Sequence, residues 1–248
     1  MTHRLILAAM LLLTVHVPLP SLAAGDPGIR TETVRFAKGA TSAQLRGTIK
    51  GDATVDYRID ARAGQTLSVK LKASNASNYF NINPPGSDVA MFIGSTSGSE
   101  TQVVLPTDGT YVVRVYLMRN AARRNETSSY TLTIGATGKA LAPLPASKDA
   151  LIPGTHFHAS ASVSCTPPFD SKPQQCEAFV IRRGFDGTAT VEIRGPNASL
   201  RRILFVAGAP VASDATEAPK HSRNGDVTVV RFGADERYDI PDVLVRGG

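Results

Sequence analysis

The 248-residue chain contains no tryptophan and only two cysteines, and aromatic residues make up only 6% of it. Glycine and proline are frequent by comparison, with 21 and 16 residues. This composition favours many short strands joined by turns over long helices. Apolar residues make up 42% of the chain and charged residues 19%. Such a chain can bury enough apolar surface to fold, which excludes wholesale disorder.

Only one long apolar run is present, from Leu5 to Val17, and it is shorter than the roughly 20 residues that span a bilayer. His3 and Arg4 precede the run, and prolines and small residues follow it up to Ala24. This arrangement is typical of a secretory signal peptide, which we assign to residues 1–24. We therefore expect a periplasmic or secreted protein that does not span a membrane.

Motifs of common enzymes are also missing. The sequence has no phosphate-binding glycine motif, no metalloprotease helix and no paired-cysteine zinc motif. The segment 94–98, Gly-Ser-Thr-Ser-Gly, is only superficially similar to a nucleophile elbow, because threonine stands at its centre. We expect a flexible turn there. These absences predict a protein without catalytic residues and without a cofactor.

Two further classes of ligand find little support. Acidic residues gather near the C-terminus without the spacing of a calcium-binding loop, and we expect them to pair with Arg231, Arg237 or Arg246. These acidic residues are Asp235, Glu236, Asp239 and Asp242. Nucleic-acid binding is not expected, because aromatics are few and basic residues form no stripe.

The two cysteines, Cys165 and Cys176, lie eleven positions apart. In an oxidising compartment they most simply form one disulfide. The alternative is a zinc site that adds His156 and His158, which share one face if that stretch is extended. Neither pair has zinc-finger spacing, so we favour the disulfide and expect no metal site.

Proline and a lapse of strand patterning mark a linker at residues 138–154, between a first domain at 25–137 and a second at 155–248. From 25 to 139 the chain has 14 basic and 9 acidic residues, whereas 140–248 has 12 of each. An acidic partner should therefore meet the first domain.

Alternation of apolar and polar residues predicts strands in both domains. In the first domain the pattern covers 42–49, 54–60, 66–71, 111–117 and 129–134. In the second it covers 179–181, 188–193, 203–206 and 227–232. The predicted fold class is all-β: an antiparallel β-sandwich followed by a second small β domain.

About ten residues separate two of these predicted strands, whereas hairpin loops usually have two to five. This connection holds Arg119, Arg123 and Arg124. If it forms one helical turn, Arg119 and Arg123 project from the same side. Such a pair of guanidinium groups suits an acidic cleft. The alternative is a solvated basic loop paired with its own Glu126.

Two resemblances are carried by particular stretches. Residues 61–69, 105–115 and 130–133 are similar to bacterial prepeptidase C-terminal modules, which implies an exported β-sandwich. A narrower resemblance rests on 34–39 with 42–44, on 47–51 with Asp56 and Tyr57, on 64–65, and on 115–130 with its Arg-Asn-x-Ala-Arg element. These stretches resemble the periplasmic inhibitors of g-type lysozyme. Residues 78–87 and the second domain depart from that pattern.

The narrower resemblance implies a protein that plugs the substrate cleft of a muramidase. It implies Arg119 and Arg123 as the main contacts, supported by Asn120 and Arg124, with Tyr57 as a weaker candidate on the neighbouring surface. Glycosidase clefts depend on carboxylates, so this chemistry is reasonable. The expected partner is a g-type lysozyme. The alternative is an accessory module that binds an anionic cell-envelope glycan.

Overall fold

The computed structural model describes residues 28–247. The expected signal peptide, residues 1–24, lies outside the described residues. Within 28–247 no helix is long and apolar enough to cross a membrane.

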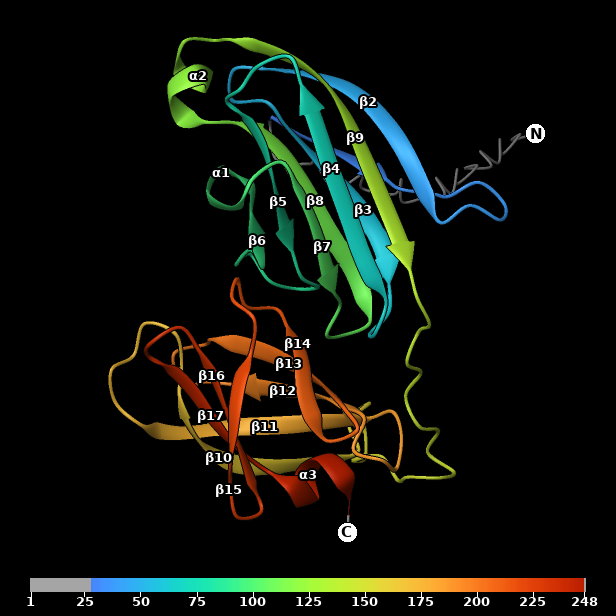
Figure 1. The fold of residues 1–248 in the computed structure, drawn as a ribbon, viewed down its shortest axis with the longest axis vertical. Helices are drawn as coiled ribbons and strands as arrows, with labels where there is room; N and C mark the ends of the chain where they lie inside the picture. The colour runs from blue at the N-terminus through green and yellow to red at the C-terminus, as the bar shows by residue number, and fades with distance from the viewer. Residues whose placement is uncertain (1–27, 248) are drawn as a thin grey trace, which may run out of the picture.

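Strands dominate the described part of the chain (Figure 1). In chain order the elements are β1 (Ile29–Thr33), β2 (Ser42–Lys50), β3 (Thr54–Ala61), β4 (Thr66–Ala73), β5 (Asn78–Asn83), β6 (Phe92–Ile93), α1 (Gly94–Ser97), β7 (Glu100–Val104), β8 (Gly109–Leu117), α2 (Arg119–Arg123), β9 (Thr127–Thr137), β10 (Ala159–Thr166), β11 (Gln174–Arg182), β12 (Ala189–Arg194), β13 (Leu200–Val206), β14 (Ala209–Ser213), β15 (Lys220–Asn224), β16 (Val227–Phe232), β17 (Glu236–Pro241) and α3 (Asp242–Arg246).

The first half of the chain is a sandwich of two sheets, in the orders β1-β3-β8-β5-β6 and β2-β9-β4-β7. Side chains of both sheets, such as Val113 of β8 and Leu132 of β9, share one buried core. Alternation along each strand puts apolar side chains into this core and polar ones outside. The all-β class is confirmed, with one departure from antiparallel pairing: β1 runs parallel to β3.

The second half is one eight-stranded antiparallel sheet in the order β14-β13-β12-β11-β10-β17-β16-β15. Phe205 of β13 and Phe232 of β16 lie far apart in this order and yet belong to the same core, so the sheet bends around it. The expected disulfide is present: Cys165 of β10 and Cys176 of β11 are bonded, and both are buried. The sulfurs therefore cannot serve the alternative zinc site.

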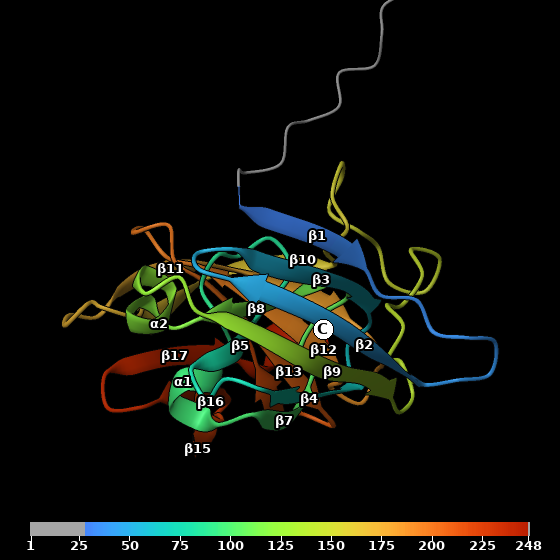
Figure 2. The same cartoon turned by 90° about the horizontal axis from the view of Figure 1, so that it is seen from above.

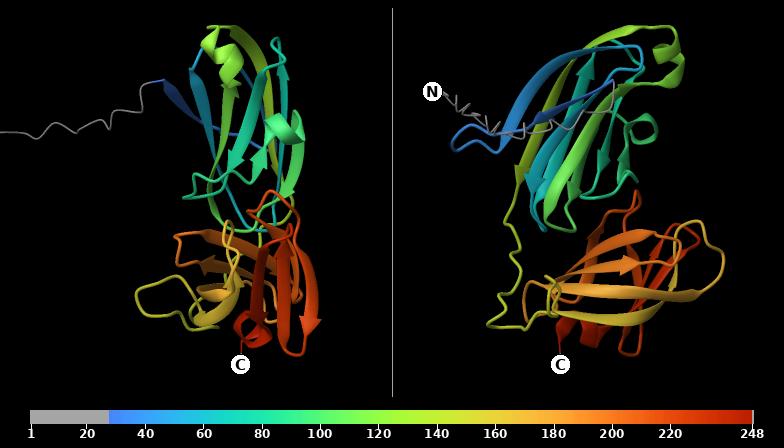
Figure 3. Two further views of the ribbon diagram at one scale, coloured as in Figure 1. Left: turned by 90° about the vertical axis from the view of Figure 1, so that its left-hand side faces the viewer. Right: turned by 180° about the vertical axis from the view of Figure 1, so that it is seen from behind.

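The segment between β9 and β10 runs along the outside of the molecule and is bonded to both halves (Figure 3). The Leu141 amide donates to the carbonyl of Ala63 at 2.9 Å, and the Leu144 amide donates to the carbonyl of Arg182 at 2.8 Å. A small cluster formed by Ala63, Leu204 and Ala212, with Leu141 against it, also joins the halves. This segment therefore takes part in the packing between the domains.

Two local expectations need correction. Residues Gly94–Ser97 form the short helix α1, closed by a 2.9 Å bond from the Gly98 amide to the Gly94 carbonyl, where a flexible turn was expected. The C-terminal acidic residues do pair with arginines, but within residues 28–247 Arg237 is the one expected partner that forms an ion pair, with Asp239. Glu236 pairs with Arg201 and Asp242 with Arg223. Arg201 and Arg223 are distant in sequence, and only sheet pairing brings them near.

Candidate functional site

The long connection between β8 and β9 forms α2 at one end of the sandwich (Figure 1). The second domain packs against the opposite end, as the views from the side and from behind also show (Figure 3). Seen from above, α2 lies toward one side of the molecule (Figure 2). We call α2 and the residues up to Glu126 the arginine loop. Its position leaves it clear of the second domain.

The helical turn forms because two alanines fill the end of the core. Ala121 and Ala122 are buried against it, at 0% and 6% exposure. The Ala122 amide donates to the Met118 carbonyl at 2.9 Å, and Asn125 closes the turn with a positive φ of 55°. Asparagine tolerates this left-handed conformation better than most residues. The small side chains thus anchor the loop while its long ones stay outside.

Arg119 and Arg123 are exposed at positions i and i+4 of this turn, so they lie on one side of it. Neither has an ion-pair or hydrogen-bond partner for its side chain within residues 28–247. Asn120, also exposed, accepts a 2.8 Å bond from the Ala121 amide through its own Oδ1. The expected helical turn is therefore present and carries two guanidinium groups that are open to a partner.

Arg124 has a different role. Its Nε donates to Glu126 at 2.6 Å, and Glu126 also accepts a 2.8 Å bond from Nδ2 of Asn75 in the β4–β5 turn. These bonds, first that from Asn75 and then that from Arg124, lower the pKa of the Glu126 carboxyl. The solvated-loop alternative, in which Glu126 neutralises the arginines, thus holds for Arg124 and not for the other two.

A second turn supports the loop from the β2–β3 side. The Gly51 amide donates to the Glu126 carbonyl at 2.9 Å. Gly51 has a φ of 59°, and a Cβ there would lie 2.8 Å from Oδ1 of Asn125. Sequence reasoning did not identify Gly51 and Asn75 as supports, because only the folded chain brings them to the loop.

The expectation that Tyr57 lies on the neighbouring surface is wrong. Its side chain is in the core at 0% exposure, and its hydroxyl is 2.8 Å from that of Tyr130. The alternation along β3 contains this signal, because Val55, Tyr57 and Ile59 share one face. Tyr57 therefore contributes to the packing of the two sheets and offers no surface for a partner.

One histidine of the second domain is buried and takes part in the structure. His158 accepts a 3.1 Å bond from the Arg182 amide at Nδ1, and its Nε2 lies 3.0 Å from the Leu144 carbonyl. Within the described part of the chain no group of three or more His, Cys, Asp or Glu could hold a metal ion.

A hollow of about 720 Å³ lies between the two domains. At its floor Arg201 donates to Glu236 at 2.6 Å and to Asp214 at 3.0 Å, and the three side chains are almost fully buried. Arg202 also donates to Asp214, through its backbone amide at 2.9 Å and through its guanidinium at 3.4 Å. These charges compensate one another, so the floor is a structural ion-pair network. The unpaired cations of the arginine loop remain the stronger candidate for a functional site.

Comparison with known proteins points to the first domain. The inhibitor of g-type lysozyme of Escherichia coli (strain K12) is 36% identical over 117 residues, which cover 46% of this chain and 84% of that protein. Crystal structures of PliG, a periplasmic lysozyme inhibitor of g-type lysozyme, are similar too. The Aeromonas hydrophila structure is 35% identical in sequence, and the match covers 44% of this chain and 97% of that chain, with a TM-score of 0.39. The Salmonella Typhimurium structure is 29% identical, and the match covers 44% of this chain and 98% of that chain, with a TM-score of 0.36. No family model matches.

The fold and the site define an all-β protein with two arginines at the end of a β-sandwich that have no partner in the described part of the chain. Through this first domain, the chain belongs to the family of g-type lysozyme inhibitors. The second domain lies outside the similarity to these relatives.

Proposed function

We propose that this protein is a periplasmic or secreted inhibitor of g-type lysozyme and that its arginine loop enters the acidic substrate cleft of the enzyme. The observation that carries the proposal is the 36% identity to the Escherichia coli inhibitor across most of that protein's length. The description of the similar structures as periplasmic inhibitors supports the location.

The proposed mechanism rests on the charges of Arg119 and Arg123. A muramidase needs a carboxyl group that protonates the leaving glycosidic oxygen. A guanidinium in the cleft forms a charge-assisted hydrogen bond with that group in its ionised form and lowers its pKa. The loop also fills space that the sugar chain would occupy. Inhibition is therefore reversible and competitive with the glycan.

Geometry makes the loop suitable for insertion. Its backbone is fixed from inside by Ala121 and Ala122 and from the side by Glu126, so little conformational freedom is lost on binding. The second domain, at the other end of the sandwich, leaves approach to the loop open (Figure 1). We assign the second domain no part in inhibition.

The test is a titration of g-type lysozyme activity on peptidoglycan with the mature protein and with an Arg119→Ala/Arg123→Ala double variant. We expect inhibition by the mature protein to saturate near one inhibitor per enzyme. The double variant should not inhibit. A c-type lysozyme serves as the enzyme control.

The matched control variant is Arg35→Ala/Arg58→Ala, because both arginines are exposed in the same domain and away from the loop. It removes the same charge and should inhibit like the wild type. Absence of inhibition by the wild type, or equal loss in both double variants, contradicts the proposal.

A further inference from the structure

We propose that the outer face of the sheet β2-β9-β4-β7 is a second binding site and that its ligand is a polysaccharide carrying carboxylate groups. We call this surface the cationic face. Four basic side chains project from it, Arg46 and Lys50 of β2 and Lys70 and Lys72 of β4. The proposal is independent of lysozyme inhibition, because the arginine loop is not part of this face.

The charge of this face is not balanced from within the described residues. Its outward positions hold one acidic residue, Glu100 of β7, which pairs with Lys70. Arg46, Lys50 and Lys72 have no ion-pair partner in residues 28–247. The opposite sheet differs, because its outer face pairs Asp56 with Arg114 through two bonds of 2.7 Å. The excess positive charge of the first domain therefore gathers on the cationic face and at the arginine loop.

Sheet register arranges these cations around hydroxyl groups. Arg46 and Lys72 are both paired with Thr131 of the central strand β9, one on each side. Neighbouring strands lie about 4.8 Å apart, so the Cα atoms of Arg46 and Lys72 are separated by about 9.6 Å, with Thr131 between them. A shallow hollow of about 540 Å³ lies at this place and is lined by all three residues.

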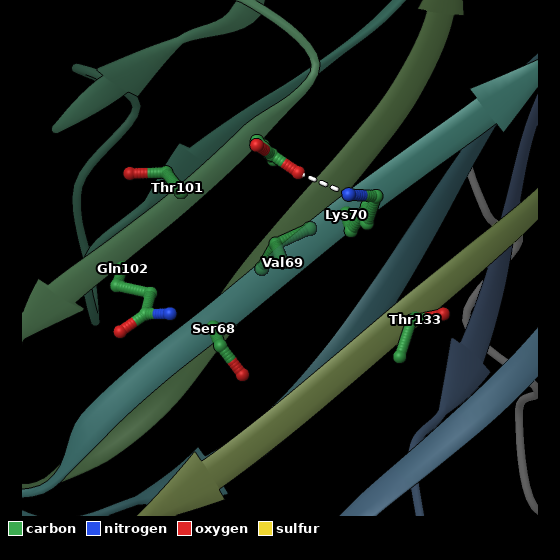
Figure 4. A pocket seen from close by; sticks show the side chains of 7 residues that line it. Ser68, Val69, Lys70, Thr101, Gln102 and Thr133 are labelled. Atoms are coloured by element: carbon green, nitrogen blue, oxygen red, sulfur yellow. Dashed lines mark hydrogen bonds and ion pairs between the residues drawn. The ribbon is translucent and has the colours of Figure 1, made fainter.

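A second shallow hollow, of about 480 Å³, lies on the same face, two residues further along β4 and β9 (Figure 4). It is lined by Ser68 and Thr133, whose hydroxyls lie on neighbouring strands, and by Lys70, which forms an ion pair with Glu100. The two hollows follow one another along β4 and β9, and hydroxyl groups lie between the free cations of the first and the paired Lys70 of the second.

The chemistry of the two hollows indicates the class of ligand. No outward position of the four strands is aromatic, so there is no ring on which a neutral sugar could stack. Cations spaced one by one match a polymer that bears one charge per unit better than a compact dianion such as phosphate. Threonine and serine hydroxyls can hydrogen-bond to sugar hydroxyls. A carboxylated polysaccharide satisfies all three conditions.

The test measures binding of the mature protein to immobilised polygalacturonate, with dextran as the uncharged polymer and polyphosphate as the phosphate polymer. We expect binding to polygalacturonate that exceeds binding to both others. It should weaken at least about tenfold between about 0.05 M and about 0.5 M salt, because the cations are exposed to solvent.

An Arg46→Gln/Lys72→Gln variant should weaken binding at least about tenfold. The equally charged control Arg35→Gln/Arg58→Gln, on other surfaces of the domain, and the loop variant Arg119→Ala/Arg123→Ala should each change it less than about threefold. Circular dichroism checks that all variants are folded. Equal binding of dextran, stronger binding of polyphosphate, or equal losses in the three variants overturns the proposal.

Discussion

Arg124 differs from Arg119 and Arg123 in having a partner. Its guanidinium is bound to Glu126, while the other two face solvent without a partner in the described residues. We therefore propose two separate tasks for three arginines that are close in sequence. In this proposal Arg124 holds the loop, and Arg119 and Arg123 contact the enzyme.

Single substitutions should separate these tasks. Arg119→Ala and Arg123→Ala should each weaken inhibition of g-type lysozyme at least about tenfold, or about 1.4 kcal/mol, because each removes a charge-assisted bond to the cleft. Arg124→Ala should weaken it less than about threefold. Inhibition constants measured under one condition decide this, and a larger loss for Arg124→Ala than for the other two contradicts the assignment.

The carboxyl of Glu126 makes loop stability depend on pH in a defined direction. Since its pKa is lowered in the folded protein, its contribution is fully present above the pKa of the unfolded chain and is lost as pH falls through the lowered folded value. The difference in Tm between the wild type and Glu126→Gln should thus be constant around neutral pH and shrink in acid.

Thermal unfolding at several pH values measures this difference. The control is Glu177→Gln, an exposed glutamate of β11 without an ion-pair partner among the described residues. Its Tm difference should stay small throughout. A Glu126→Gln difference that grows as pH falls contradicts the proposed pairing.

At the scale of elements, the β2–β3 turn should matter to α2 because Gly51 touches Asn125. Gly51→Ala places a Cβ 2.8 Å from Oδ1 of Asn125 and forces alanine to a φ of 59°. We expect a loss of about 1 to 3 kcal/mol in the free energy of unfolding, together with weaker inhibition.

The matched control is Gly86→Ala in the same domain, with a φ of 64° and no atom within 4 Å of the added Cβ. Gly86→Ala therefore introduces the same backbone strain without a close contact to the added Cβ. Denaturant unfolding should show a smaller loss in the free energy of unfolding for Gly86→Ala than for Gly51→Ala. The Gly86→Ala variant should inhibit lysozyme as the wild type does. Equal effects of the two variants on inhibition contradict a supporting role for the β2–β3 turn.

Strands with strict alternation could be predicted from the sequence, and elements that depend on distant pairing could not. The predicted strands at 54–60 and 66–71 correspond to β3 and β4 within one or two residues. The strand β5 was missed because asparagines occupy half of its six positions and two prolines follow it. Asparagine is depleted in strands, and here packing overrides that preference.

The same distinction applies to the candidate site. The length of the β8–β9 connection and its arginines were visible in the sequence, and the helical turn is confirmed. Which arginine pairs with Glu126 depends on the folded backbone, and the contribution of Asn75 depends on a contact across 51 positions of sequence. Tyr57 was misplaced because the resemblance outweighed the alternation that puts it in the core.

At the scale of the whole molecule, Arg183 joins the two domains. Its side chain is 0% exposed and donates to Asp108 of the first domain at 3.1 Å and to the Leu141 carbonyl. Beside it, the Thr190 hydroxyl donates to the Pro106 carbonyl at 2.7 Å. The guanidinium also donates to Thr190 of its own domain at 2.9 Å, but its one carboxylate partner within residues 28–247 is Asp108 of the other domain. A buried charge whose counter-ion lies in the other domain favours a fixed arrangement of the two.

Arg183→Met should therefore loosen the domains. We expect the free energy of unfolding to fall by about 2 kcal/mol or more, since Asp108 and the Leu141 carbonyl each lose a charged partner. Calorimetry should change from one transition to two. The control Arg231→Met, an exposed arginine of β16, should leave the transition unchanged. A single, unshifted transition for Arg183→Met contradicts the role of this contact.

The central claim is that Arg119 and Arg123 contact the catalytic carboxyl of a g-type lysozyme, and a double-mutant cycle tests it most directly. Calorimetric titration gives Kd for the wild type and the Arg119→Ala/Arg123→Ala variant, each against the native enzyme and against an enzyme whose catalytic carboxyl group is replaced by the corresponding amide. We predict a coupling free energy of at least about 1.5 kcal/mol between the two changes. Additive effects, with no coupling, would contradict the account.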